Sequence, residues 1–417
     1  RDLHSTSRRQ RQMCIRDSIT TLLEMCFSNM EGGMEINLNK IKENDIIKIL
    51  FAENPGIVIQ VKDKDKAEVK KILEDAGIGY VKLGTPTDER HILVTKEDAT
   101  YQFGIDYLRD VWYSTSYLLD RKQSMNGCAK KRFENYKEQP LEFVFDKSFT
   151  GKFSQYGITP ERRTPTGIKA AIIREKGTNG EREMAYMLYL AGFDVKDVTM
   201  TDLISGRETL EDINMIVFCG GFSNSDVLGS AKGWAGAFLF NPKAKAALDN
   251  FYARKDTLSL GVCNGCQLMI ELGLINPEHN KKAKMLHNDS HKFESKFVGV
   301  TVPMNRSVML GSLSGSKLGI WVAHGEGKFS LPYEEDKYNV VLKYSYDEYP
   351  GNPNGSDYSV AGLASSDGRH LAMMPHLERS CFPWQNAYYP SDRINKDQVT
   401  PWIEAFVNAR KWVEMNK

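Results

Sequence analysis

The chain has 417 residues, of which 55 are Lys or Arg and 54 are Asp or Glu, so its formal net charge is +1. At roughly 150 residues per domain, this length predicts two or three domains. The balanced charge argues against a dedicated nucleic-acid-binding protein. No stretch approaches the roughly 18 consecutive apolar residues that a membrane helix needs, so we expect neither nucleic-acid nor membrane partners.

Seven cysteines are spread through the chain without a repeating framework. This is not the pattern of a disulfide-rich secreted domain. We therefore expect a reducing, cytoplasmic setting, in which a special cysteine is more often catalytic than structural.

Residues 1–18 are rich in arginine and show no apolar periodicity. They lack the apolar stretch of a secretory signal, although an organellar presequence or a nucleic-acid-binding arm is an alternative. The part from 8 to 18 resembles translated sequencing-adapter sequence. We interpret residues 1–18 as a non-native artefact on a chain that begins with Arg1 rather than Met, and we expect the chain to be a fragment.

Short patterns over residues 19–128 predict a small α+β domain. A β-branched run at 57–61 follows an Asn-Pro-Gly turn and is typical of a strand. Apolar residues recur at helical spacing over 69–76. We expect further strands at 78–83 and 91–94.

The charged, proline-containing segment 129–166 has weak periodicity, and we expect a linker. The pattern changes over 167–417, where buried-strand runs occur at 169–173, 215–219 and 258–262. Helical segments lie between them, and this alternation predicts an α/β domain with a mostly parallel sheet.

The helix between the first two strands is expected over 180–191, with Asn179 as its N-cap. Ligands of such sheets bind beyond the carboxyl ends of the strands. The residues that follow the second and third strands, Gly220-Gly221 and Cys263, are therefore candidates for a site. Residues 350–355, rich in Pro, Gly and Asn, predict a flexible loop with no assigned chemistry.

Cys263 lies in a Gly-x-Cys-x-Gly pattern between a strand and a helix. Glycines on both sides permit the sharp, strained turn of a nucleophile elbow. The N-terminus of the following helix favours a thiolate, and the N–H of Asn264 would face an oxyanion formed on an attacked carbonyl.

Two other interpretations of Cys263 stay open at this point. A free cysteine is commonly a small buried hydrophobic residue. Cys263 and Cys266 could also form a redox or metal pair. Zinc needs four ligands, and His287 and His291 have no second pair to complete a site, so we expect no metal site.

A cysteine nucleophile needs a base and a group that orients the base. The best candidates are His376 and Glu378, which follow an apolar run and Pro375. In an extended segment, side chains two residues apart point the same way, so the carboxylate could orient the imidazole. The alternative is that His376 is an ordinary polar residue after a strand.

Together these motifs resemble the class I, or triad, glutamine amidotransferases. More narrowly, they resemble the glutaminase domain of the large, fused phosphoribosylformylglycinamidine synthases. The resemblance rests on motifs in the same order, at 220–229 (GGFSNSDVLG), 261–267 (GVCNGCQ), 288–293 (NDSHKF), 323–329 (AHGEGKF) and 375–379 (PHLER).

The resemblance implies a flavodoxin-like sheet with helices on both faces for residues 167–417. It also implies that residues 19–128 are the end of a synthetase domain that resembles aminoimidazole-ribonucleotide synthetase and is unrelated to ATP-grasp domains. The ATP and metal motif Asp-x-Ser-x-Gly-Gly of that domain is missing here.

The resemblance also implies the roles of individual residues. Cys263 would form a γ-glutamyl thioester, His376 would move protons, and Glu378 would hold His376 in its tautomer. The oxyanion hole would be formed by the backbone N–H groups of Gly221 and Asn264.

The remaining pocket residues implied by the resemblance would contact or line the site of the substrate glutamine. They are Gln267, His324, Gly325 and Glu326. Leu377 departs from the family pattern, which usually has Pro there, and we expect at most reduced rigidity of the loop.

The implied activity is a step of purine biosynthesis: ammonia from glutamine converts formylglycinamide ribonucleotide to the amidine. The complete enzyme would use ATP and Mg²⁺, whereas the glutaminase domain would need no cofactor. The alternatives are a non-catalytic redox or partner-binding module on the same fold, and a cysteine hydrolase with a nucleophile elbow. A His376 side chain beside Cys263 would argue against the non-catalytic module.

Overall fold

A computed structural model describes residues 11–13, 17–138 and 141–417 of the chain. The expected artefact therefore lies largely outside the described residues. The chain divides into two compact units, 1–122 and 123–417, and each is described by itself. None of the described helices combines the length and the apolar character of a membrane-spanning segment.

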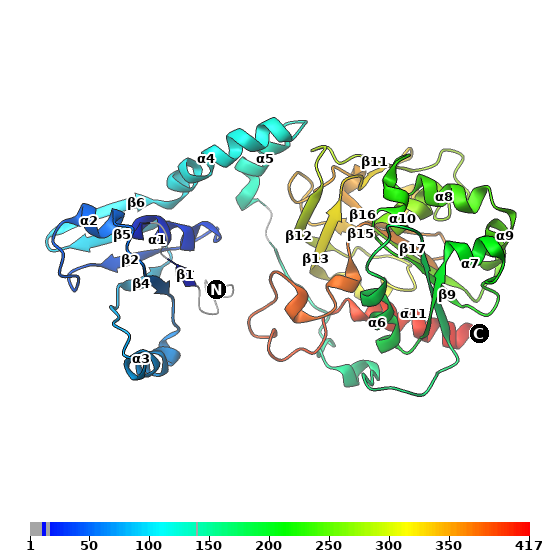
Figure 1. The fold of residues 1–417 in the computed structure, drawn as a ribbon, viewed down its shortest axis with the longest axis horizontal. Helices are drawn as coiled ribbons and strands as arrows, with labels where there is room; N and C mark the ends of the chain where they lie inside the picture. Colours follow the sequence, from blue (N-terminus) through cyan, green and yellow to red (C-terminus); the bar gives the residue numbers. More distant parts are fainter. Residues whose placement is uncertain (1–10, 14–16, 139–140) are drawn as a thin grey trace. The chain divides into compact units, whose positions relative to one another are not determined.

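The smaller unit is an α+β structure around a four-stranded sheet (Figure 1). Its strand order is β4-β2-β5-β6, with β2 and β5 parallel and the outer pairs antiparallel. The chain order is β1 (Arg11–Met13), α1 (Ser18–Phe27), β2 (Gly33–Asn37), α2 (Ile46–Phe51), β3 (Ile57–Ile59), α3 (Lys66–Asp75), β4 (Gly84–Thr87), β5 (His91–Lys96), β6 (Ala99–Gly104) and α4 (Ile105–Gln123).

The prediction of a strand at 78–83 is wrong. Ile78, Tyr80 and Val81 are exposed, and β4 begins only at Gly84. Apolar residues alone do not make a strand, because a strand also needs a neighbour for its backbone groups. The helix predicted over 69–76 and the strand predicted at 91–94 are confirmed as α3 and β5.

The larger unit contains a nine-stranded sheet of order β13-β12-β15-β16-β17-β10-β9-β7-β8. The strands from β17 to β8 are parallel, and the other four are antiparallel. These strands are β7 (Lys169–Arg174), β8 (Asp194–Thr199), β9 (Met215–Phe218), β10 (Leu258–Val262), β12 (Glu294–Thr301), β13 (Lys317–His324), β15 (Asn339–Tyr344), β16 (Val360–Ala364) and β17 (His370–Met373).

The α/β class is confirmed, and its helices fall into two groups that pack among themselves (Figure 1). Helix α6 (Glu181–Ala191) packs against α11 (Ile403–Asn416). The second group contains α7 (Met200–Ser205), α8 (Lys232–Leu239), α9 (Pro242–Ala253) and α10 (Asn264–Glu271). The remaining elements are α5 (Cys128–Glu134) and the β11–β14 pair (Lys284–Leu286 with Lys328–Ser330).

The order β10-β9-β7-β8 places a topological switch point between β7 and β9. The chain moves outward from β7 to β8 and then returns to the other side of β7. Right-handed crossovers in opposite directions place helices on opposite faces and leave a crevice at the carboxyl ends of the strands. The carboxyl ends of β7 and β9 therefore mark the expected position of a site.

Helix α6 starts differently from the prediction. Its N-cap is Gly180, in the left-handed conformation, and Asn179 does not cap it. The side-chain oxygen of Asn179 accepts a hydrogen bond from Arg379 instead. The predicted end is confirmed, with Gly192 as a left-handed C-cap.

Candidate active site

Cys263 occupies a strained turn between β10 and α10. Its φ and ψ are 54° and −108°, a conformation that non-glycine residues rarely adopt. Its backbone N–H donates to Met373 O at 2.9 Å, which ties the turn to the end of the neighbouring strand β17. This is the geometry of the predicted nucleophile elbow.

The two glycines of the elbow are required because backbone atoms approach them closely. A Cβ on Gly261 would lie 2.5 Å from Gly265 O, and a Cβ on Gly265 would lie 2.6 Å from the carbonyl carbon of Phe218. Neither obstacle is the flexible end of a side chain. The sequence pattern therefore reflects close packing of α10 against β9 and β10.

We expect Gly265→Ala to destabilise the larger unit by about 3 kcal/mol, because the added methyl group overlaps backbone. The matched control is Gly236→Ala in α8, where a Cβ would meet only the Phe240 side chain at 3.7 Å. That change should be neutral or stabilising by up to about 1 kcal/mol, as glycine disfavours helix. Thermal unfolding of both variants tests this, and equal unfolding midpoints would contradict it.

His376 and Glu378 lie beyond the end of β17, next to Cys263. Nδ1 of His376 and Oε1 of Glu378 are 2.7 Å apart, and both side chains are almost fully buried. This bond selects the tautomer in which Nδ1 carries the proton and Nε2 is free to accept one. A Cβ on Gly220 would lie 2.9 Å from His376 Cε1 and 3.4 Å from Cys263 Cβ, so the imidazole and the cysteine flank the same glycine.

The pKa of the His376 imidazole depends on its burial and on the neighbouring side chains. Burial alone would lower its pKa, but the Glu378 carboxylate and then the Cys263 side chain outweigh it and raise the pKa to about 9. Nε2 is buried and has no hydrogen-bond partner among the described residues. The raised pKa makes the His376 imidazole a stronger base than a free histidine, as the removal of a thiol proton requires.

The raised pKa predicts a pH-dependent stability. A histidine whose folded-state pKa is raised stabilises the fold below its unfolded pKa, 6.5, and this stabilisation is lost as the pH rises through about 9. We expect Glu378→Gln to be less stable than the unsubstituted chain by about 3 kcal/mol at pH 6.5. The difference should shrink at pH 9.5. A difference in unfolding midpoint that is constant over this range would contradict the pairing.

Gly221 and Asn264 are the residues predicted to form the oxyanion hole. Gly221 has a φ of 123° and lies in an isolated bridge with Thr178. The bonds of that bridge run from Asn179 N to Gly220 O and from Phe222 N to Gly177 O, so the N–H of Gly221 is not one of its donors. Asn264 is the first residue of α10, where backbone N–H groups have no partner within the helix.

The side chain of Asn264 has a second role that the sequence did not reveal. Its Oδ1 accepts from Ser223 N at 3.0 Å, and its Nδ2 donates to Gln267 Oε1 at 2.9 Å. Asn264 therefore fastens the loop after β9 to the helix after the elbow. The sequence assigned a role only to the backbone N–H of Asn264, so it did not predict these two side-chain hydrogen bonds.

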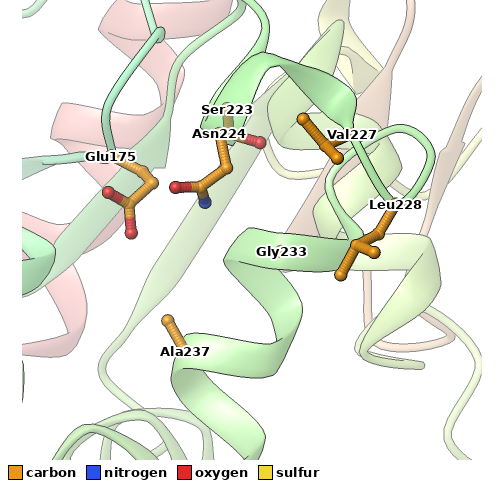
Figure 2. Close-up of a pocket in the computed structure, with 7 residues that line it drawn as sticks. All are labelled: Glu175, Ser223, Asn224, Val227, Leu228, Gly233 and Ala237. Carbon is orange, nitrogen blue, oxygen red and sulfur yellow. The ribbon is translucent and has the colours of Figure 1, made fainter.

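The loop after β9 borders a cavity of about 480 Å³ (Figure 2). The backbone of this loop is strained. Asn224, Ser225 and Asp226 have φ values of 52°, 55° and 48°, in the left-handed region. Such strain persists only where the surroundings impose it. The cavity is lined by Glu175, Ser223, Asn224, Val227, Leu228, Gly233 and Ala237.

Gln267 and the segment 323–326 meet at the same place. Gln267 Nε2 donates to Glu326 O at 2.7 Å, and the Cys263 thiol donates to Ala323 O at 3.4 Å. The Glu326 carboxylate accepts from Ser230 N at 3.2 Å. The structure thus brings together Gln267, Glu326 and Cys263, while contact of any of them with a substrate stays a prediction.

His324 is fully buried, and burial, followed by the positive His376, lowers its pKa to about 3. Neither ring nitrogen has a hydrogen-bond partner among the described residues. A Cβ on Gly327 would lie 2.5 Å from its Nδ1, so the ring lies against the chain that follows it. His324 is therefore a neutral imidazole at physiological pH.

The alternative of a metal or redox centre gains no support. In the described part of the chain, no group of three or more His, Cys, Asp or Glu side chains could hold a metal ion. Cys266 is completely buried, and burial raises its pKa well above the usual value. A neutral thiol in the core is a poor partner for thiol–disulfide exchange.

Comparison with known proteins points to one group. A model of the CobB/CobQ-like glutamine amidotransferase domain matches residues 167–413. Human phosphoribosylformylglycinamidine synthase is 38% identical over 94% of this chain and 31% of its own length. Its probable Arabidopsis thaliana counterpart, named as chloroplastic/mitochondrial, is 37% identical over 95% of this chain and 29% of its own length. The chain thus spans about 30% of these relatives.

Among solved structures, one described as PurLQS from Thermotoga maritima is similar to this chain. It has 28% sequence identity and a TM-score of 0.46, and the match covers 59% of this chain and 98% of that one.

Proposed function

The chain belongs to the CobB/CobQ-like glutamine amidotransferase domain family, and from that premise we propose that residues 167–417 hydrolyse glutamine to glutamate and ammonia. The observation that carries the proposal is the buried pair of His376 and Glu378, 2.7 Å apart, beside a cysteine held in an elbow. A redox module would need neither side chain there.

In the first step, Nε2 of His376 takes the proton from the Cys263 thiol. Glu378 accepts the Nδ1–H bond and stabilises the imidazolium that forms. The thiolate then attacks the γ-carboxamide carbon of glutamine. The new oxyanion accepts hydrogen bonds from the N–H groups of Gly221 and Asn264.

In the second step, the tetrahedral intermediate collapses. His376 gives its proton to the leaving nitrogen, which departs as ammonia, and a γ-glutamyl thioester remains on Cys263. Water attacks the thioester with His376 as base, and glutamate leaves as the proton returns to the sulfur. Each step thus uses His376 once as acid or base, and the site ends in its starting state.

We propose that this ammonia serves the ATP-dependent conversion of formylglycinamide ribonucleotide to its amidine in purine biosynthesis, as the relatives' names suggest. Residues 19–128 would be the end of the synthetase part, 129–166 a linker and 1–18 an artefact. ATP and Mg²⁺ would be used by the synthetase part of the complete enzyme, whose Asp-x-Ser-x-Gly-Gly motif is missing from this chain. We propose a cytoplasmic location.

A coupled assay of the whole chain tests the proposal. Glutamine should yield glutamate and ammonia in equal amounts, and asparagine should yield neither at a comparable rate. Hydrolysis of simple esters or amides without preference for glutamine would instead favour a general cysteine hydrolase.

A further inference from the structure

The segment from Ala323 to Gly327 contributes backbone carbonyl groups to the site. Ala323 O accepts from the Cys263 thiol, and Glu326 O accepts from the Gln267 amide. Strand β13 ends at His324, so the later part of the segment is not held in a sheet. The sheet positions Ala323, which pairs with Ser295, but other contacts must fix the position of Glu326 O relative to Cys263.

Asn288 contacts this segment at three places. Its Nδ2 donates to His324 O at 2.7 Å, its backbone N donates to Gly325 O at 2.9 Å, and its Oδ1 accepts from Gly327 N at 3.0 Å. The second hydrogen of Nδ2 donates to Lys292 O at 2.9 Å. Asn288 is completely buried.

The amide of Asn288 is therefore saturated by peptide groups, with both donors and the acceptor in use. Asn354, also completely buried, supports the segment a second time, through its Nδ2 bond to Gly327 O at 2.7 Å. Buried peptide groups that lose such partners shift until they find others, because unpaired polar groups are costly. A displacement of about 1 Å at a site can lower its rate about 100-fold.

We infer that Asn288 is a positioning residue for glutamine hydrolysis, and that it acts through the Glu326 carbonyl group on Gln267. This inference rests on the proposed function. It assigns to the 288–293 motif a task at the site, although Asn288 itself does not reach Cys263 or the substrate.

The competing explanation is that Asn288 only stabilises the fold. A matched control is Asn214, which is also buried and donates to the Asp256 carboxylate at 3.1 Å. Asn214 immediately precedes β9, and Gly220 lies two residues beyond the other end of that strand. Its loss should affect stability without reaching the site.

The test compares Asn288→Ala and Asn214→Ala in the whole chain, with kcat and KM for glutamine measured separately. A purely structural defect lowers the folded fraction, which reduces the apparent kcat and leaves KM unchanged. We expect Asn288→Ala to raise KM at least about tenfold and to lower kcat, and Asn214→Ala to leave KM within about twofold.

An unchanged KM in Asn288→Ala, whatever its kcat, would overturn the positioning role, as would an equal rise in Asn214→Ala. Should Asn288→Ala not fold, Asn288→Ser serves in its place, since it keeps a hydroxyl donor, and we expect its KM to rise at least about threefold. An unsubstituted chain without glutaminase activity would instead contradict the proposed function itself.

Discussion

Replacement of Cys263 by Ala is expected to lower glutamine hydrolysis by roughly 10⁴-fold or more, because no other group in the site can form the thioester. The sulfur is held in a strained elbow, its proton is directed at Ala323 O, and the His376 imidazole lies beside it. The assay is glutamate release by the whole chain.

The matched control is Cys266→Ala, one helical turn farther along α10. Cys266 is completely buried, and burial keeps its thiol protonated. We expect this variant to retain activity within about threefold, with a small loss of stability for the lost sulfur. If Cys266→Ala lost activity while Cys263→Ala retained it, Cys263 would not be the nucleophile.

His376→Asn is expected to have an effect of similar size, a fall in kcat of roughly 10⁴-fold or more. Asn cannot take the thiol proton or return it to the leaving nitrogen. It can still hydrogen-bond Glu378, so the variant tests proton transfer more than packing. The double variant Cys263→Ala, His376→Asn should be no worse than either single one, since residues that act as one unit do not add.

A matched control for His376 is His370→Asn, at the first residue of β17, the strand that leads to His376. His370 is also buried and bonds Ser259 Oγ at 2.9 Å, near the amino end of the sheet. It should remain active within about threefold. A general loss of activity in both variants would indicate damage to β17 rather than loss of a base.

The parts of the site that the sequence predicted best are those fixed by local geometry. The elbow at Cys263 follows from a strand, two glycines and a helix in direct succession. The pairing of His376 with Glu378 was predicted for an extended segment, whereas Leu377–Arg379 form a 3-10 turn that still brings the two side chains together. Both patterns are complete within a few residues. The parallel strands β7, β9 and β10 were likewise visible as short buried runs.

The parts that could not be predicted depend on distant contacts. Asn288 and Asn354 are separated by 66 residues along the chain, and nothing local indicates that both hold Gly327. Residues 350–355 were expected to form a flexible loop, yet Asn352 and Asn354 are buried and bonded within the larger unit. Turn-forming composition reports backbone conformation and says nothing about burial.

The antiparallel half of the sheet was missed for a related reason. Strands β12, β13, β15 and β16 pair with one another outside the βαβ pattern, so their order depends on tertiary contacts rather than on alternation with helices. At 78–83 the error is the reverse, because a strand was predicted where none exists. The apolar run there has no partner strand and is irregular.

The most direct test of the account is to label the whole chain with an electrophilic glutamine analogue, such as a chloroketone, and to locate the adduct by peptide mass spectrometry. The account predicts one adduct on Cys263, protection by glutamine, and slow labelling in His376→Asn. An adduct on Cys266 or on another cysteine, with Cys263 unmodified, would contradict it.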